Sequence, residues 1–505
     1  MHNALEPLND APAVGGDERG LGAEDFRLIN RSGFGDGLNS YAHSMAWFQG
    51  RLYVGTTRGV LQMNKCNLPT PNMKPWPTDW KPDVYDYDRR AEIWRFDPAE
   101  GRWTRIYQAI WVTDASGKPV PRYIGFRGMA VFKGAADTKP CLYASTWAPA
   151  RAPEPPDILR CEDGDTFASV PRPPFGPQVR SFRTLQPFQG RIHTTPTSSS
   201  AVVAGVRRAM DSVGSESTIY CTDDIAGAQW TNANTEGFGE RANVTVFEMV
   251  EYHGRLYAGT VNPRGLQLWR TENADKPPYT WKKVLDKGAF RGKHNEAAAS
   301  LCVFKGALYV GTGIANGGFH RQFRIGPAAS EVLRVWPDDS WELLVGLPRE
   351  TPQGLKSPLS GYGAGFDNLF NGYIWRMAEH AGWLYVGTFS WANVLPYVPL
   401  NVWPEDVLVL VRRWGLDRLN RDLGGFDLWR TPDGVRWECV TRSGFDNPYN
   451  WGVRNFASTP HGLFVGTANP YGPEVAIQRN GKWQYVKNPR GGCEVFLGHR
   501  REPGT

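Results

Sequence analysis

The chain has 505 residues, of which 41% are hydrophobic and 21% are charged, the composition of a folded globular protein. Its formal net charge is +6, but the lysines and arginines form no run, which argues against binding to nucleic acid. No stretch of about 18 apolar residues occurs, so we expect no membrane-spanning helix. Met1–Gly22 lacks the basic and apolar regions of a signal peptide.

The seven cysteines are odd in number and show no C-x-x-C spacing. Most of them, such as Cys141 and Cys302, lie in strand-like segments. This pattern favours small buried side chains in a reducing compartment over a disulfide framework or a zinc site. We therefore expect a cytoplasmic protein.

A strand-like pentad of one design recurs seven times at irregular spacings. Each copy has an apolar residue, an aromatic residue (His193 in one copy), two small residues, and then Thr or Pro. The copies are Leu52–Thr56, Leu142–Thr146, Ile192–Pro196, Leu256–Thr260, Leu308–Thr312, Leu384–Thr388 and Leu463–Thr467. A repeat of this kind indicates one supersecondary unit copied many times, with connecting loops of variable length.

Each copy expands into four predicted strands. An apolar segment and a tight turn precede the pentad, which forms the second strand. A third strand such as Asp427–Arg430 and a fourth strand led by an aromatic residue, such as Trp437–Val440, follow it. The turn Thr431–Trp437 resembles a shortened Asp-box, a hairpin found on several unrelated propellers.

Over residues 24–498 the chain resembles the seven-bladed β-propeller class with Asp-box-like or kelch-like repeats. The resemblance implies an all-β fold of seven four-stranded blades. Phe26–Phe34 mirrors Trp437–Phe445, a fourth strand and its exit, whereas Cys493–Phe496 looks like a third strand. We therefore predict that residues 26–29 complete the last blade and close the ring, with residues 1–23 flexible. The alternative makes Trp483–Val486 the fourth strand of that blade.

Three long inserts, 57–90, 389–425 and 473–487, are predicted to lie on one loop face, where binding sites usually occur. The alternative is that they only cover hydrophobic edges. Pro404-Glu405-Asp406 predicts the start of a helix, which could act as a lid or dock a protein partner.

The repeat also sorts the nine histidines. His193 takes an aromatic position of the pentad, so we expect it to pack between blades. Three histidines have no structural position in the repeat: His43, His294 and His320. With Glu296 they form a hypothetical site for a divalent metal; otherwise they are separate loop residues.

Alignment of the first strands on the turn glycine places His43, Arg127 and Arg183 at one position, which Asn455 fills in the last copy. Near this position lie three further charged residues: Glu248, Arg376 and Arg454. Either Glu248 and Glu296 neutralise the arginines, or an anionic ligand does.

These residues define the candidate site. The candidate ligand-binding residues are Arg127, Arg183, Arg376, Arg454 and Asn455. The candidate catalytic residues are His43, Glu248 and Glu296. The ligand would be a carboxylate, a sulfate or a phosphate held by arginines under the long loops.

Two propeller enzyme families offer partial likenesses. Sialidases hold a substrate carboxylate with three arginines, but their Phe/Tyr-Arg-Ile-Pro motif is replaced here by Phe126-Arg127-Gly128-Met129. Carotenoid cleavage oxygenases bind iron with four histidines, more than the unexplained histidines of this chain. No G-x-S-x-G, H-E-x-x-H or phosphate-loop motif occurs. The sequence thus favours a small-molecule enzyme or ligand-binding protein, with a protein-interaction scaffold as the alternative.

Overall fold

The computed structural model describes residues 19–500 except 68–72, 172, 174, 177, 199, 204–205, 210–216, 228, 316–317 and 319–324. Strands dominate these residues, which confirms the predicted all-β class. The chain forms two compact bodies. The first comprises His43–Arg58 and Tyr87–Ala289, and the second comprises the described parts of Pro12–Ala42, Gly59–Asp86 and Phe290–Thr505.

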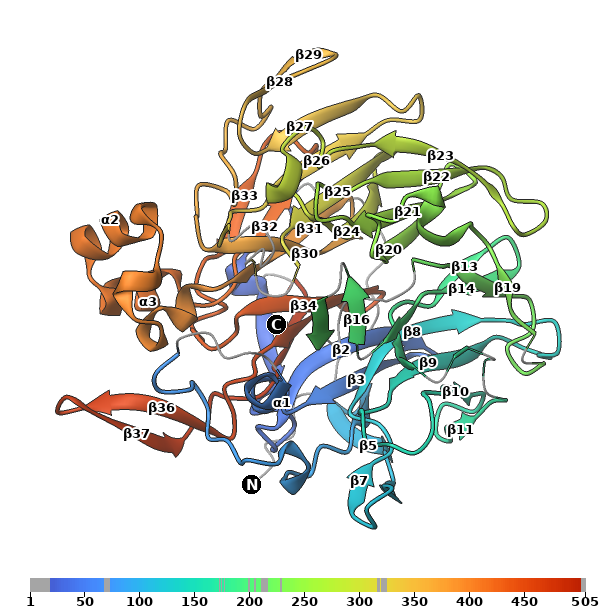
Figure 1. Cartoon of the computed structure of the whole chain (residues 1–505), viewed down its shortest axis with the longest axis horizontal. Helices are drawn as coiled ribbons and strands as arrows, with labels where there is room; N and C mark the ends of the chain where they lie inside the picture. Colours follow the sequence, from blue (N-terminus) through green and yellow to red (C-terminus); the bar gives the residue numbers. More distant parts are fainter. Residues whose placement is uncertain are drawn as a thin grey trace. The chain divides into compact units, whose positions relative to one another are not determined.

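The first body is built on four antiparallel four-stranded sheets (Figure 1). The first sheet has β2 (Asn39–Phe48, whose first residues belong to the second body), β3 (Arg51–Arg58), β4 (Glu92–Asp97) and β5 (Arg102–Gln108). The next has β8 (Gly125–Phe132), β9 (Cys141–Trp147), β10 (Ile158–Cys161) and β11 (Ala168–Ser169). The third has β13 (Gln186–Phe188), β14 (Arg191–Thr194), β18 (Tyr220–Thr222) and β19 (Thr231–Asn232). The fourth has β20 (Thr245–Tyr252), β21 (Arg255–Val261), β22 (Leu268–Asn273) and β23 (Thr280–Leu285).

Smaller elements complete the first body. They are the strand pairs β6 (Trp111–Thr113) with β7 (Pro119–Pro121), β12 (Val179–Phe182) with β15 (Pro196–Ser198) and β16 (Ser200–Val203) with β17 (Val206–Ala209), and the 3₁₀ turn η3 (Glu236–Gly239).

The second body contains three sheets of the same plan. One has β24 (Ala297–Phe304), β25 (Ala307–Gly313), β26 (Val332–Val335) and β27 (Trp341–Val345). Another has β30 (Asn371–His380), β31 (Trp383–Ser390), β32 (Leu428–Thr431) and β33 (Glu438–Thr441). The third has β34 (Gly452–Thr459), β35 (Gly462–Ala468), β38 (Val495–Gly498) and β1 (Phe26–Asn30).

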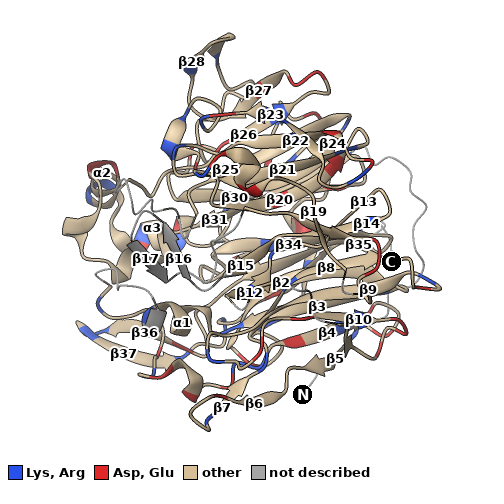
Figure 2. Ribbon diagram, turned by 45° about the vertical axis from the view of Figure 1, so that its right-hand side comes forward, with Lys and Arg blue, Asp and Glu red and all other residues tan. Residues whose placement is uncertain are grey.

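The remaining elements of the second body are short. They are η1 (Ala23–Asp25), α1 (Val60–Asn67), η2 (Val84–Asp86), η4 (Gly292–His294), η5 (Ala392–Tyr397), η6 (Leu400–Val402), α2 (Glu405–Trp414) and α3 (Leu416–Leu423), with the hairpins β28 (Arg349–Thr351)–β29 (Gly354–Lys356) and β36 (Glu474–Arg479)–β37 (Lys482–Lys487). Helix α2 begins with acidic residues and ends with arginines, which complements the helix dipole (Figure 2). No helix in the described part of the chain is long and apolar enough to cross a membrane.

The N-terminal strand β1 is the fourth strand of the last sheet, as the mirrored end sequences predict. Phe26 pairs with Gly498 and Leu28 pairs with Phe496. The alternative fourth strand, Trp483–Val486, belongs instead to the separate β36–β37 hairpin, so that interpretation is wrong. Leu21 is also anchored, because it is 5% exposed and its N–H donates to the hydroxyl of Tyr385. The rest of the segment predicted to be flexible, residues 1–18, lies outside the described residues.

A threonine hydroxyl at the end of the second strand organises six of the sheets. It accepts a hydrogen bond from the backbone N–H of the residue at or just before the start of the third strand. The pairs are Thr56–Glu92, Thr146–Asp157, Thr260–Gln267, Thr312–Glu331, Thr388–Asp427 and Thr467–Glu494. All six partner residues are buried acids or amides. The bond therefore sets where each third strand begins.

A buried asparagine joins this bond to the turn that leads into the first strand. Asn371 donates to the Gly365 carbonyl and to Asp427, and Asn450 repeats these contacts with Gly444 and Glu494. The two glycines have φ of +67° and +60°, a conformation that favours glycine. The asparagine thus links three parts of one sheet that are distant in sequence.

His193 packs between two sheets of the first body, as its place in the pentad predicts. Its ring lies on Phe188, and Nε2 is 3.0 Å from the hydroxyl of Tyr279 in the neighbouring sheet. Burial lowers the pKa of His193 to about 4. The thiols of Cys141, Cys161, Cys221, Cys302, Cys439 and Cys493 are free.

The three predicted inserts form one packed group in the second body, which we call the cap. Leu61 and Trp76 come from the first insert, Val407 from the second and Val475 from the third, and all share one apolar cluster. Backbone hydrogen bonds join the inserts as well: Lys74 to Tyr397, and Ala476 to Pro77. The same cluster contains Tyr373, Trp375 and Trp451 at the first strands β30 and β34. The cap therefore covers the start of these strands.

Deletion of β1 is expected to destabilise the last sheet. Removal of residues 1–18 leaves the pairing of β1 with β38 in place, whereas removal of residues 1–35 exposes the edge of β38 and the apolar residues that β1 covers. We expect a loss of about 3 kcal/mol or more in unfolding free energy for the longer deletion only. Urea denaturation of both proteins measures this, and an unchanged midpoint for the longer deletion would contradict the pairing.

Asp427 is expected to make stability depend on pH. Burial raises its pKa from 3.8 to about 6, so the folded protein retains a proton that the unfolded chain loses. Stability should therefore fall as the pH rises from about 4 to about 6, by about 3 kcal/mol. Asp427→Asn should abolish this fall, since Gln267 already supplies an amide at the equivalent place. Urea midpoints of both proteins across this range test it; equal pH dependence in the two would refute it.

Candidate functional site

The first strands carry a β-bulge at one recurrent position. In five of them the register shifts around a single residue, and these residues are Arg127, Phe247, Ala299, Trp375 and Arg454. The alignment on the turn glycine placed Asn455 in this set, and the register corrects it to Arg454. The turn after β34 has two residues, as after β20, β24 and β30, but its glycine, Gly462, is the first residue of β35 and not the last residue of the turn, which displaced the alignment by one residue. Bulges reorient side chains and are common beside functional sites.

In the first body, Trp147 brings two predicted site residues together. The guanidinium of Arg127 lies 5.2 Å from the centre of its ring, and the His43 ring meets it edge-on at 6.4 Å. Arg127 also donates to the hydroxyls of Ser181 and Thr197, at 2.8 and 3.2 Å. All of these residues are buried. A guanidinium, hydroxyls and an imidazole around one aromatic ring are groups that can bind a carboxylate or a phosphate.

The other predicted residues of the first body have different surroundings. Arg183 is buried and its guanidinium lies 4.0 Å from the centre of the Phe247 ring. Glu248, the candidate catalytic acid, is half-buried, and its Oε1 accepts the N–H of Met249 at 3.3 Å. His43 Nδ1 is 2.6 Å from the hydroxyl of Thr57. These contacts position Arg183 and His43 in the first body without assigning a catalytic step.

In the second body, Arg454 lies in an aromatic environment beside the cap. It is 5% exposed and stacks on Trp375 at 5.2 Å. Tyr41 contacts both Trp375 and Trp451. Burial raises the pKa of Tyr41 far above its ordinary value, and the positive charge of Arg454 opposes this rise. The Tyr41 hydroxyl therefore lies within the electrostatic field of Arg454.

Arg376 and Asn455 flank this environment. Arg376 donates to the backbone carbonyls of Ala299 and Trp375 at 3.3 and 3.2 Å. The Asn455 side-chain oxygen accepts the N–H of Phe456 and thus supports the bulge. Asn455 therefore has a backbone role, whereas Arg454 presents its guanidinium to the aromatic rings.

The metal hypothesis concerns residues from both bodies and one outside the described residues. His320 lies outside them. Glu296 is buried, and its Oε2 accepts the N–H of Ala315 at 2.9 Å. Burial and the nearby Arg291 lower the pKa of His294. In the described part of the chain, no three or more His, Cys, Asp or Glu side chains form a group suited to a metal ion. The role of His320 stays a prediction.

Sequence reasoning missed two features. The aromatic partners of the arginines, Trp147 and Trp375, occupy different positions in the repeat, so no motif marks them. A Glu, Asp or Gln recurs at the start of the third strand in six copies, but its role follows only from the contact with the threonine.

Comparison with known proteins assigns no family. No family model and no curated protein matches the sequence. Solved structures with some likeness include a Pyrococcus horikoshii acylaminoacyl peptidase, with 8% identity, 88% of this chain and 52% of that chain covered, and a TM-score of 0.40. A Mycobacterium tuberculosis puromycin-hydrolyzing peptidase has 11% identity, coverage of 92% and 62%, and a TM-score of 0.38.

A GH93 α-L-arabinofuranosidase of Fusarium graminearum has 9% identity, coverage of 70% and 88%, and a TM-score of 0.36. The chain thus spans about half the length of the acylaminoacyl peptidase. Similarities at these TM-scores identify neither an activity nor a detailed fold for this chain.

Proposed function

We propose that the chain is a seven-bladed β-propeller whose last blade is completed by β1. Seven pentads in the sequence, and the four and three four-stranded sheets of the two bodies, support this. The pairing of β1 with β38 supports the split last blade. Tyr41 at the start of β2 pairs with Ala468 at the end of β35, the contact expected where the last blade meets the first.

We propose further that the protein binds an anionic small molecule, a carboxylate, sulfate or phosphate, through arginines of its first strands, as an enzyme or a binding protein. The observation that carries this proposal is Arg454, a buried guanidinium stacked on Trp375 next to Tyr41 and beside the cap. Stacking fixes the plane of a guanidinium, and a fixed plane favours two parallel hydrogen bonds to a carboxylate or phosphate. Arg127 with its hydroxyl neighbours is a second such group in the first body.

Substitution of Arg454 tests the proposal. Arg454→Lys keeps the charge but loses the planar fork, and Arg454→Met also removes the charge. We expect phosphate, sulfate or citrate to bind about tenfold more weakly to the lysine variant and not measurably to the methionine variant. Calorimetric titration of each anion into the purified proteins measures this.

Arg430→Lys is the matched control. Arg430 also stacks on a tryptophan, Trp383, at 5.3 Å, but its charge is paired with Glu438. Anion binding should be unchanged in this variant. If all three variants bind every anion as the wild type does, the arginine site is not the binding site.

The first-body arginines give an independent test. Arg183→Ala and Arg127→Lys should reduce anion affinity more than they reduce the melting temperature if a ligand is their counter-ion. A large loss of stability with anion binding intact would instead make these arginines structural. Parallel titrations and thermal melts separate the two results.

A protein-interaction scaffold is the alternative function, and the second insert supplies an observation in its favour. Four of its apolar residues are between 40 and 50% exposed: Leu400, Val402, Val409 and Trp414. Exposed apolar residues on one insert are typical of a docking surface. The absence of any anion binding in the titrations above, with the fold intact, would favour this alternative.

A further inference from the structure

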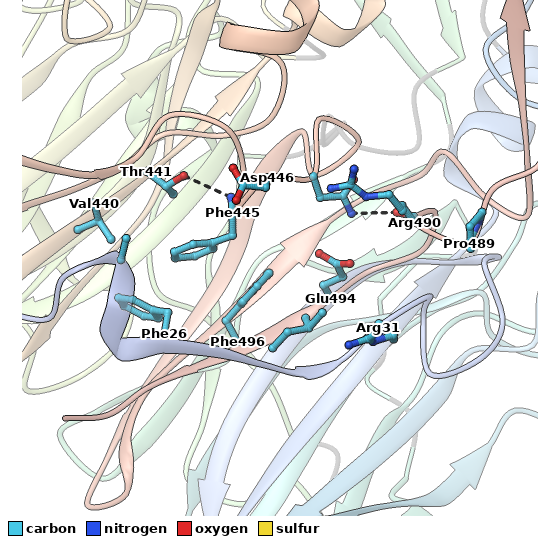
Figure 3. A pocket seen from close by; sticks show the side chains of 13 residues that line it. Phe26, Arg31, Val440, Thr441, Phe445, Asp446, Pro489, Arg490, Glu494 and Phe496 are labelled. Atoms are coloured by element: carbon cyan, nitrogen blue, oxygen red, sulfur yellow. Dashed lines mark hydrogen bonds between the residues drawn. The ribbon is translucent and has the colours of Figure 1, made fainter. Parts of the chain in front are cut away.

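A cavity of about 650 Å³ lies in the second body, apart from the arginine site of the first strands. It is lined by residues of β1 and β33, by the turn after β33, and by the segment before β38. Figure 3 shows aromatic side chains at one end, Phe26, Phe445 and Phe496, and charged groups at the other. The cavity therefore presents an apolar end and a polar end.

The charged end contains both signs. Arg31 and Arg490 contribute two guanidinium groups, and Glu494 and Asp446 contribute two carboxyl groups (Figure 3). Both arginines are exposed, whereas Glu494 is 5% exposed. The Asp446 Oδ1 accepts the hydroxyl of Ser443 at 3.1 Å. Each acid thus keeps further acceptor capacity for a ligand.

Glu494 differs from the equivalent acid of three other sheets. There the acid is paired with an arginine: Glu92 with Arg105, Asp157 with Arg122, and Glu331 with Arg349, all at 2.8 to 2.9 Å. Glu494 resembles Asp427 instead, because it accepts the amide of Asn450 at 2.7 Å as Asp427 accepts the amide of Asn371. Burial raises the pKa of Glu494, and the charges of Arg31 and Arg490 oppose this rise, although among the described residues Glu494 makes no ion pair.

The charges of this cavity are therefore held near one another without being joined. Neither arginine forms an ion pair with any described residue, and Arg490 is placed through its backbone, whose carbonyl accepts the amides of Asn447 and Asn469. Side chains held in this way keep their donors directed at solvent and available to a ligand. A ligand with a single charge would pair with either the two arginines or the two acids, but not with both.

We propose that this cavity binds a small zwitterion with an apolar side chain, such as an α-amino acid with an aromatic ring. Arg31 and Arg490 bind its carboxylate, and Glu494 with Asp446 binds its ammonium group. The side chain packs on Phe26, Phe445 and Phe496, whose rings contact one another at 5.2 and 4.6 Å. Aromatic rings at this spacing favour a further ring in an edge-on or offset arrangement. The inference does not depend on the proposed anion site.

Titration of four probes tests the assignment of each end. L-phenylalanine carries both charges and the ring, N-acetyl-L-phenylalanine lacks the ammonium group, phenethylamine lacks the carboxylate, and glycine lacks the ring. We expect L-phenylalanine to bind and each other probe to bind about tenfold more weakly or worse. Calorimetry on the full chain measures this.

Two substitutions should separate the charges. Arg490→Gln should weaken L-phenylalanine and N-acetyl-L-phenylalanine about tenfold and leave phenethylamine unchanged. Glu494→Gln should weaken L-phenylalanine and phenethylamine about tenfold and leave N-acetyl-L-phenylalanine unchanged. The glutamine side chain still has an oxygen that can accept the amide of Asn450. Gln267 shows that glutamine fits the equivalent position, and thermal melts verify folding. If Glu494→Gln does not fold, Arg490→Gln and Arg31→Gln alone decide, because both arginines are exposed.

The repeat provides matched controls. Arg264 in Asn262-Pro263-Arg264-Gly265 corresponds to Arg490, and Arg442 corresponds to Arg31, but neither lines the cavity. Arg264→Gln and Arg442→Gln should bind L-phenylalanine as the wild type does. The proposal is overturned if the wild type shows no saturable L-phenylalanine binding, if N-acetyl-L-phenylalanine binds as tightly, or if Arg490→Gln has no effect.

Discussion

The hydrogen bond from the backbone N–H at the start of the third strand to a threonine hydroxyl on the second strand is the contact on which six of the sheets depend. It fixes where the third strand begins, and in all six sheets the residue that donates it is a buried acid or amide. A buried carboxyl or amide is stable only when its hydrogen-bonding groups are satisfied. Asn371 and Asn450 provide this in two sheets of the second body, and arginines provide it at Glu331 and, in the first body, at Glu92. The six copies thus have a buried acid or amide at the same point, and its hydrogen-bonding groups are satisfied by different partners in different copies.

The differences between these partners explain where the candidate sites lie. Where an arginine pairs with the acid, the charges cancel and the position is structural. Glu494 makes no ion pair among the described residues, and it lines one cavity together with Arg31 and Arg490. The arginines of the bulges form another case: Arg127 and Arg454 lie against tryptophan rings, and Arg127 also donates to two hydroxyls. A repeat fold can therefore keep its backbone constant and vary its chemistry by one or two side chains per copy.

The cap shows how irregular loops gain a defined structure. Each insert alone has too few apolar residues for a core, but Leu61, Trp76, Val407 and Val475 pack into one cluster in the second body. Backbone hydrogen bonds between the inserts satisfy groups that would otherwise be buried without partners. Because the cluster includes Trp375, the ring on which Arg454 stacks, the cap and the arginine belong to one packed unit.

The sequence by itself determined the all-β class, the four-strand unit and the membership of β1 in the last sheet. These properties depend on local alternation, turn residues and copied segments, which are visible wherever a pentad or a Ser-Gly-Phe turn recurs. It also predicted the packing of His193, since the repeat assigns that residue an aromatic position. It placed Asn455 where Arg454 stands, because the glycine used for the alignment comes one residue later in the last copy, and only strand pairing defines the register. The tertiary structure alone decided which arginines stack on Trp147 or Trp375 and which surround Glu494. Such contacts join residues that are far apart in the chain, and a local sequence pattern cannot predict that these residues lie close together in space.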